Sequence, residues 1–348
     1  MRFEGGGASG CACCVSRRGF FAAAAAVAAS AAPASQAAAP RQIVDVHAHF
    51  TPPAYKRVLE PAGLLTPQTL NWNVERHLEE MDKAGVSRSL LSLTTPGVPT
   101  LDSAGRALVR EVNEYAARLA ADHRGRLGWF VYTPLGDVDL ALREVAYGLD
   151  VLKANGVGLF TSYGKLWLGD PAFDPLFQEL ERRRATVYVH PLAGPCCQGL
   201  VPTIGDAVIE YGTDTTRAIA SYVYRGAARR FPNVRMIWSH AGGTMPFLIE
   251  RFDFADSANA AYKAAAPDGF RAAAGRFFYD VAQASNRTAT GALRQVAAPS
   301  QILFGTDYPF RTPAEHVTQL EGAGVFDRAE LEGLYRGNVQ RALPGLLV

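Results

Sequence analysis

Five side chains that could bind a metal or transfer a proton stand at the ends of short hydrophobic runs in this 348-residue sequence. Four are histidines and one is an aspartate: His47, His49, His190, His240 and Asp307. Because alternate side chains of a strand point to the same side, the imidazoles of His47 and His49 can face one ion. Three imidazoles and a carboxylate suit one first-row divalent metal ion, with zinc as the leading candidate and manganese, iron or cobalt as alternatives.

The runs that carry these residues belong to a regular alternation that starts near residue 41. Eight β-branched or aromatic runs are predicted strands: Ile43–His47, Ser87–Leu93, Leu127–Thr133, Val157–Tyr163, Thr186–His190, Val234–His240, Phe277–Ala282 and Ile302–Thr306. Helical periodicity follows them over 74–83, 106–122, 140–154, 175–184, 215–230, 245–254 and 288–296, with two more helices between 312 and about 341. The stretches 192–214 and 255–275 are predicted to be longer connections that cap the site or make subunit contacts.

Eight strand-then-helix units predict an α/β fold, a single (β/α)8 TIM barrel over residues 40–348. Active sites of such barrels lie at the C-terminal ends of the strands, where these five residues are placed. The alternative is a doubly wound open sheet, but no glycine-rich dinucleotide fingerprint follows the first strand. A metal at a barrel mouth admits water or substrate, which favours a catalytic site over a closed structural one.

The alternative interpretation of the cluster is purely structural: the histidines would belong to the core and be satisfied by hydrogen bonds. Random placement would scatter histidines over helices and loops, as happens with the three others. These three are interpreted as solvated residues on helix faces: His77, His123 and His316.

Four segments resemble the four motifs of the amidohydrolase superfamily, and most of all its aminocarboxymuconate-semialdehyde decarboxylase-like branch, also called amidohydrolase 2. They are Asp45-Val46-His47-Ala48-His49-Phe50, Val189-His190-Pro191, Trp238-Ser239-His240-Ala241-Gly242-Gly243 and Leu303-Phe304-Gly305-Thr306-Asp307-Tyr308-Pro309. The resemblance implies that one metal is held by His47, His49, His190 and Asp307, that His240 is the acid/base, and that Asp307 also handles protons. Binuclear relatives in the superfamily hold a second metal with a carboxylated lysine at the end of strand 4. Lys165 lies beyond that strand, in the loop, so the resemblance implies a single metal ion.

The resemblance also bears on substrate and assembly. Arg251 matches an arginine that the semialdehyde decarboxylases send across a dimer interface to the substrate carboxylate, so a homodimer is expected; an exposed helix residue is the alternative. Gln68 stands where those enzymes have another substrate-binding arginine. Residues 206–214 and 279–282 look more like the 6-methylsalicylate decarboxylases of the same branch.

The resemblance favours a carboxy-lyase that removes CO₂ from a hydroxylated aromatic acid resembling 6-methylsalicylate, without oxidation. In this hypothesis the metal binds the carboxylate and an ortho oxygen, and His240 or metal-bound water protonates the ring carbon. Phe50, Trp72 and Tyr308 are expected to contact the substrate ring. Two alternatives stay open: hydrolysis of a lactone, ester or amide at the same site, and a non-catalytic periplasmic binding protein.

Charge and composition argue against nucleic acid and the membrane as partners. The net charge is +2, with 35 Lys+Arg against 33 Asp+Glu. The sequence has no stripe of basic residues that would indicate nucleic-acid binding. No run of 18 strongly apolar residues predicts a membrane span.

The first 39 residues look like a cleavable twin-arginine (Tat) signal peptide. Ser16-Arg17-Arg18-Gly19-Phe20-Phe21 precedes a stretch in which 13 of residues 21–39 are Ala. We therefore expect export, to the periplasm or beyond, and no membrane association after cleavage. The only cysteines after the signal are the adjacent Cys196 and Cys197, so no disulfide framework is expected.

Overall fold

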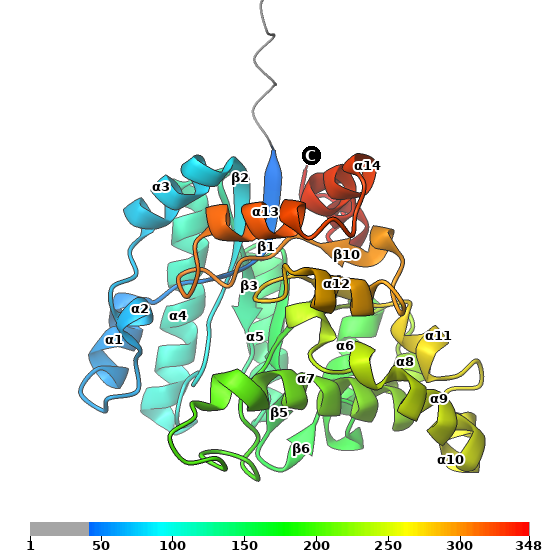
Figure 1. Cartoon of the computed structure of the whole chain (residues 1–348). Coiled ribbons are helices and arrows are strands. Elements are labelled where there is room, and N and C mark those ends of the chain that lie inside the picture. The colour runs from blue at the N-terminus through cyan, green and yellow to red at the C-terminus, as the bar shows by residue number, and fades with distance from the viewer. Residues whose placement is uncertain (1–41, 348) are drawn as a thin grey trace, which may run out of the picture. The chain divides into compact units, whose positions relative to one another are not determined.

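The computed structural model describes residues 42–347, and the predicted signal peptide lies outside these residues. Its centre is a sheet of eight parallel strands (Figure 1) in the order β1-β2-β3-β4-β7-β8-β9-β10. Their bounds are β1 Ile43–His49, β2 Val86–Ser92, β3 Leu127–Tyr132, β4 Gly156–Phe160, β7 Thr186–His190, β8 Arg235–Trp238, β9 Phe278–Asp280 and β10 Ile302–Leu303. The strand order follows the sequence and never reverses, which does not suit a doubly wound sheet.

The two edges of this sheet meet through the segment that follows β10. The Val46 amide donates to the Phe304 carbonyl at 3.0 Å and the His49 amide to the Tyr308 carbonyl at 2.7 Å. Ala48 and Tyr308 form an isolated parallel bridge. The sheet is thus a nearly closed eight-stranded parallel barrel, consistent with the predicted (β/α)8 barrel.

Helices alternate with the strands around this barrel, as in other α/β folds with a parallel sheet. They are α1 Pro53–Leu59, α2 Pro67–Leu70, α3 Val74–Ala84, α4 Ser103–Asp122, α5 Val138–Ala146, α6 Asp174–Arg183, α7 Asp206–Tyr224, α8 Ala227–Arg230, α9 Ile249–Ala258, α10 Ala260–Ala265, α11 Phe270–Ala274, α12 Arg287–Leu293, α13 Pro313–Gly322, α14 Arg328–Glu332 and α15 Val339–Ala342. None of the helices within residues 42–347 has the length and apolarity needed to cross a bilayer.

Burial on both faces explains why the strands read as nearly continuous hydrophobic runs. All seven residues of β1 and all five of β7 are buried. Parallel pairing then brings strand ends together: His49 is opposite Ser92 on β2, and His190 is opposite Phe160 on β4. The C-terminal ends of the strands therefore share one end of the barrel.

Two predicted connections contain helices. Helix α7 begins at Asp206, nine residues before the predicted start, and continues through Gly212. A Cβ on Gly243 would lie 2.0 Å from the Gly212 carbonyl oxygen, so Gly243 lets the loop after β8 approach α7 closely. The predicted connection 255–275 likewise contains α10 and α11.

The predicted strand 157–163 is divided. Strand β4 ends at Phe160, and the chain then forms a small antiparallel hairpin of β5 Ser162–Tyr163 and β6 Leu166–Trp167. The Asp214 carboxylate on α7 holds this hairpin: it accepts hydrogen bonds from Ser162 at 3.2 Å and from the Trp167 indole at 2.7 Å.

The interpretation of His77 and His316 as solvated residues is wrong, because both are fully buried. His77 accepts a hydrogen bond from the Trp72 indole at 3.3 Å, and its other ring nitrogen lies 3.2 Å from the Ser89 hydroxyl. His316 lies 3.1 Å from the Ser285 hydroxyl. Hydrogen bonds to both ring nitrogens make it possible to bury His77. Only Nδ1 of His316 has a partner among the described residues. His123, just after α4, is half-buried.

Candidate active site

Four of the five predicted residues converge on one point at the C-terminal end of the barrel. One ligand atom from each of His47, His49, His190 and Asp307 can be chosen so that all lie within 4.8 Å of one another. All four residues are buried. The histidines end β1 and β7, whereas Asp307 follows β10, so the cluster depends on closure of the barrel.

Each histidine of this cluster is oriented by the ring nitrogen that faces away from it. Nδ1 of His47 lies 2.9 Å from Asp280 Oδ2, Nδ1 of His49 lies 3.2 Å from the Ser92 carbonyl, and Nδ1 of His190 lies 2.8 Å from the Pro191 carbonyl. A protonated Nδ1 that donates to each oxygen leaves the Nε2 lone pair free. Metal-binding histidines are commonly held in this way.

The donor atoms of the cluster need a positive charge between them. His47 Nε2 and His49 Nε2 are 3.2 Å apart, and Asp307 Oδ1 lies 3.2 Å from the first and 2.9 Å from the second. With no cation to separate them, one of these lone pairs must take up a proton. Burial alone would lower the pKa of His47, but the carboxylates of Asp280 and Asp307 outweigh it and raise the pKa to about 10. The negative charge that keeps a proton on His47 would also favour a divalent cation at this point, so the residues suit a metal ion.

The other cluster members remain in the forms that bind metals. Burial lowers the pKa of His49 and lowers that of His190 well below its usual value, so both imidazoles are neutral. Burial opposes ionisation of Asp307, but the charge and hydrogen bonds of His47 and a hydrogen bond from His49 hold its pKa well below the usual range. Neutral imidazoles and an ionised carboxylate are what a divalent metal requires.

His240 lies beside this cluster without belonging to it. Its ring centroid is 4.8 Å from that of His47 and 5.7 Å from that of His190. Nδ1 lies 3.0 Å from the Ala282 carbonyl, which fixes the ring and leaves Nε2 available for proton transfer. Burial and the neighbouring His47 lower its pKa below the usual value.

The backbone around the site is tightly constrained. His240, Ala241 and Asp307 have positive φ angles of 53°, 56° and 63°, a conformation that is uncommon for residues other than glycine and is concentrated at functional sites. Gly305 shows how close the packing is, because a Cβ there would lie 2.9 Å from the Cβ of His47. The glycine of the Gly305-Thr306-Asp307 segment is therefore required by the approach of β1.

Asp45 joins β1 to this same segment. One carboxylate oxygen accepts from the amides of His47 at 2.9 Å and Thr306 at 3.1 Å, and the other accepts from the Thr306 hydroxyl at 2.6 Å. Burial raises the pKa of Asp45 to about 7. The first residue of the Asp45-Val46-His47 motif thus fixes the register at which the barrel edges meet.

The predicted substrate-binding residues are distributed more widely. Phe50, Trp72 and Tyr308 are buried. The rings of Trp72 and Tyr308 lie 6.2 Å and 4.6 Å from that of His77, and the Phe50 ring lies 6.4 Å from that of Trp72. Arg251 is exposed on α9. Their contact with a substrate stays a prediction.

Three residues near the cluster were not identified individually from the sequence. Asp280 orients His47, and the Tyr211 ring lies 6.2 Å from that of His190. The third, Gln283, contacts Asp307. A signal existed for two of them, because Tyr211 and Asp280 fall within the segments that resemble 6-methylsalicylate decarboxylases. Phe310, an aromatic residue that the sequence did suggest for the substrate pocket, has its ring 6.0 Å from that of His49.

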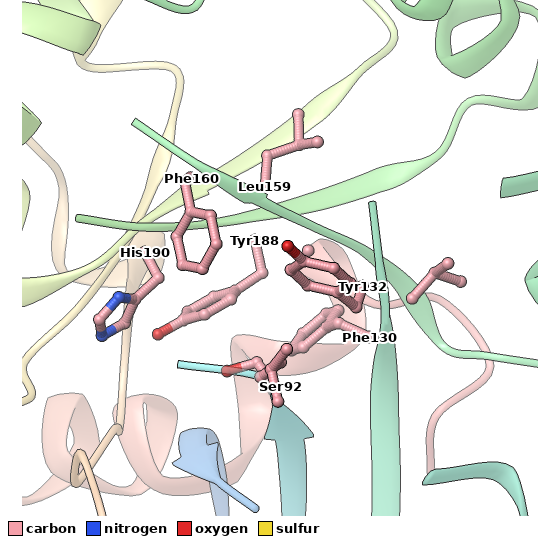
Figure 2. A pocket seen from close by; sticks show the side chains of 10 residues that line it. Ser92, Phe130, Tyr132, Leu159, Phe160, Tyr188 and His190 are labelled. Carbon is pink, nitrogen blue, oxygen red and sulfur yellow. The ribbon is translucent and has the colours of Figure 1, made fainter. Parts of the chain in front are cut away.

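A small cavity of about 10 Å³ adjoins His190 in the barrel interior and is lined by Tyr132, Phe160 and Tyr188 (Figure 2). It has room for about one water molecule and not for an aromatic ring. The Tyr188 hydroxyl is buried and has no hydrogen-bonding partner among the described residues. This cavity therefore does not accommodate an aromatic substrate.

The comparisons with known proteins agree with this site. The amidohydrolase family model Amidohydro_2 matches residues 44–345. The chain belongs to the amidohydrolase family. The resemblance indicated by the four motifs is thereby confirmed.

Curated relatives and solved structures refine this placement. The chain is 34% identical over 277 residues to 6-methylsalicylic acid decarboxylase of Penicillium expansum, covering 76% of this chain and 84% of that protein. It is 32% identical over 328 residues to the decarboxylase yanB of Aspergillus niger, covering 86% of this chain and 87% of that protein. The fold is similar to that of 5-carboxyvanillate decarboxylase from Novosphingobium aromaticivorans, which was solved with manganese. The TM-score is 0.78 at 17% identity, and the match covers 87% of this chain and 96% of that structure.

Proposed function

We propose that this chain is a metal-dependent decarboxylase that removes CO₂ from a hydroxylated aromatic acid resembling 6-methylsalicylate, without oxidation. The observation that carries the proposal is the buried cluster of three imidazoles and one carboxylate with His240 beside it. The similarity to 6-methylsalicylic acid decarboxylase over 76% of the chain supports this choice of reaction. It supports a carboxy-lyase over the hydrolase and binding-protein alternatives.

The proposed roles follow the geometry. His47, His49, His190 and Asp307 would hold one divalent metal, and its positive charge would help to bind and orient the acid. Zinc is our leading candidate from the ligand types, and manganese, which the carboxyvanillate decarboxylase holds, is the first alternative.

His240 is the proposed proton carrier. Its Nε2 is the ring nitrogen not engaged with Ala282, so the imidazolium donates from Nε2 to the ring carbon that bears the carboxylate. The proton adds to that carbon and interrupts aromaticity. The bond to the carboxylate then breaks, CO₂ leaves, and its electron pair restores the ring. The net reaction takes up one proton for each CO₂ released.

We also propose a homodimer. Phe247 and Phe254 are 83% and 72% exposed, and Arg251 lies between them in sequence. Residues at spacings of four and three lie on one side of a helical segment, so these three side chains present one face. A second copy that covered this face would bury the two phenylalanines and place Arg251 at the interface.

Export by the twin-arginine route is a further part of the proposal, and it is supported by the Arg17-Arg18 pair and the alanine-rich stretch that follows. The proposed domain organisation is then a signal peptide over 1–39 and a (β/α)8 barrel over 40–348. Cell fractionation tests the location: an R17K/R18K double variant should be retained in the cytoplasm.

One experiment tests the reaction. The metal-loaded protein is offered 6-methylsalicylate and other hydroxybenzoates, and in parallel lactones and aryl esters, while CO₂ release and acid production are recorded. We expect CO₂ from at least one ortho-hydroxylated benzoate. Hydrolysis without CO₂ release would exclude the decarboxylase proposal.

A further inference from the structure

Gln283 makes a contact with Asp307 that the proposed mechanism does not use. Its side-chain Nε2 donates to Asp307 Oδ2 at 3.1 Å. The other carboxylate oxygen, Oδ1, faces His47 at 3.2 Å and His49 at 2.9 Å. The two oxygens of Asp307 thus have separate partners, one in the cluster and one outside it. Because an ionised carboxylate only accepts hydrogen bonds, the NH₂ end of the amide must face it.

Gln283 belongs to a short segment that orients three groups of the site. Asp280 accepts from His47, and the Ala282 carbonyl accepts from His240. The segment is itself held by a hydrogen bond of 3.0 Å from the Ala284 amide to the Val281 carbonyl. With the Gln283 contact, the four-residue segment 280–283 orients three side chains of the site: His47, His240 and Asp307.

The conformation of Gln283 indicates that the contact has a purpose beyond folding. Its φ is 55°, in the left-handed region where glycine and asparagine are favoured over glutamine. Gln283 is also exposed, so burial of its side chain does not offset this strain. Strained backbone positions of this kind cluster at active sites and ligand clamps.

We propose that Gln283 is a positioning residue that keeps Asp307 bound to the metal through Oδ1 alone. By holding Oδ2, it prevents the carboxylate from turning to present both oxygens, and so leaves a coordination position on the open side for the substrate. This inference rests on the proposed function, but its first test needs no substrate.

The test uses cobalt(II) in place of the native metal, because the visible absorption of cobalt weakens as its coordination number rises. The variants are Gln283→Leu, which has no amide, and Gln283→Asn, which tolerates the left-handed conformation but is one methylene too short. We expect weaker absorption from both, as Asp307 becomes free to bind through two oxygens. We also expect metal affinity or kcat/KM to fall by about 10- to 100-fold, the usual cost of losing a partner of a metal ligand.

Two further variants separate positioning from stability. Gln283→Gly relieves the positive φ, so it should unfold at the same or a higher temperature than the parent and still show the weaker cobalt absorption. Gln319→Leu, an exposed glutamine on α13, is the matched control and should leave the spectrum and kinetics unchanged. Parental cobalt spectra and metal affinity in all three Gln283 variants would overturn the proposal. A parent protein that binds cobalt but releases no CO₂ would instead contradict the proposed function alone.

Discussion

At the scale of single residues, the proposed metal site depends on the residues that orient the four proposed ligands as much as on the ligands themselves. Asp280 is the clearest case, because one of its oxygens lies 2.9 Å from His47 Nδ1 and the other accepts from the amides of His240 and Ala282, both at 3.0 Å. One buried carboxylate therefore sets the tautomer of a metal-site histidine and the position of the proposed proton carrier.

Asp280→Asn is predicted to weaken metal binding and turnover. An asparagine has one acceptor oxygen, so it can satisfy either the two amides or the His47 N–H, and its NH₂ group faces the remaining donor. We expect metal affinity to fall by about 10- to 100-fold with the fold retained. Metal titration monitored by calorimetry measures the loss, and parental affinity would contradict the assigned role.

His240→Asn separates binding from catalysis. The side chain lies outside the four-residue cluster, so bound metal should stay near one ion per chain. Turnover should fall by about 10²- to 10⁴-fold, the usual contribution of a general acid. Metal analysis and CO₂ release are measured on the same preparation. Loss of the metal would show that His240 is a ligand.

At the scale of elements, loops and helices outside the barrel complete the site. Helix α7 starts early enough to place the Tyr211 ring 6.2 Å from that of His190, and the Tyr211 hydroxyl lies 2.9 Å from the Thr95 hydroxyl after β2. The segment after β9 contacts α13 through Ser285 and His316. The site is thus framed by elements that are distant in sequence.

His316 on α13 should make stability depend on pH. Burial, with a smaller effect from Arg311, lowers its pKa to about 4 in the folded state, against an ordinary value of 6.5. The unfolded chain therefore binds more protons between pH 6.5 and pH 4, so this histidine favours the folded state above pH 6.5 and its contribution is lost as the pH falls toward 4. The loss is about 1.4 kcal/mol per pH unit over that interval.

A His316→Gln variant should therefore lose less stability than the parent as the pH falls from 6.5 to 4. Denaturant unfolding at a series of pH values measures the difference between the two slopes. The control is His123→Gln, because His123 is half-buried after α4 and reaches solvent in the folded protein. Parallel curves for the parent and His316→Gln would disprove the expectation.

At the scale of the whole molecule, the metal and the second copy both act on stability. The four cluster residues come from β1, β7 and the segment after β10, so a bound ion links the two edges of the barrel. A ligand that binds only the folded state stabilises it according to its concentration and affinity.

Removal of the metal by a chelator should abolish CO₂ release and lower the melting temperature. At a metal concentration 1,000 times the Kd the stabilisation is about 4 kcal/mol, which for a chain of this size corresponds to a shift on the order of 10 °C. Scanning calorimetry measures the shift, and re-addition of zinc or manganese identifies the ion that restores both properties. An unchanged melting temperature after complete removal would argue against metal binding to the folded barrel.

Phe254→Arg tests the proposed dimer. A charge within the exposed face around Arg251 should convert a dimer into a monomer, measured as mass by light scattering. Val58→Arg, at a residue that is 51% exposed on α1, is the matched control and should leave the mass unchanged. A parent protein that is already monomeric would refute the proposal.

Much of this architecture could be predicted from local pattern. The eight strands occur where the hydrophobic runs indicated, with ends shifted by a few residues, because a strand buried on both faces requires such a run. The positions of His47, His49, His190 and Asp307 at strand ends were also visible, since alternation and parallel topology bring such ends together.

Tertiary structure decided which polar groups are buried and which partner each one has. His77 and His316 could not be recognised as buried from helical periodicity, because the hydroxyls that they contact, Ser89 and Ser285, lie on other segments. The Gln283–Asp307 contact spans 24 residues and forms only when β9 and β10 pair. Hydrogen-bonding partners brought together by folding leave no periodic signal. The sequence therefore determined the strands and the candidate ligands, and only the fold determined how those side chains are held.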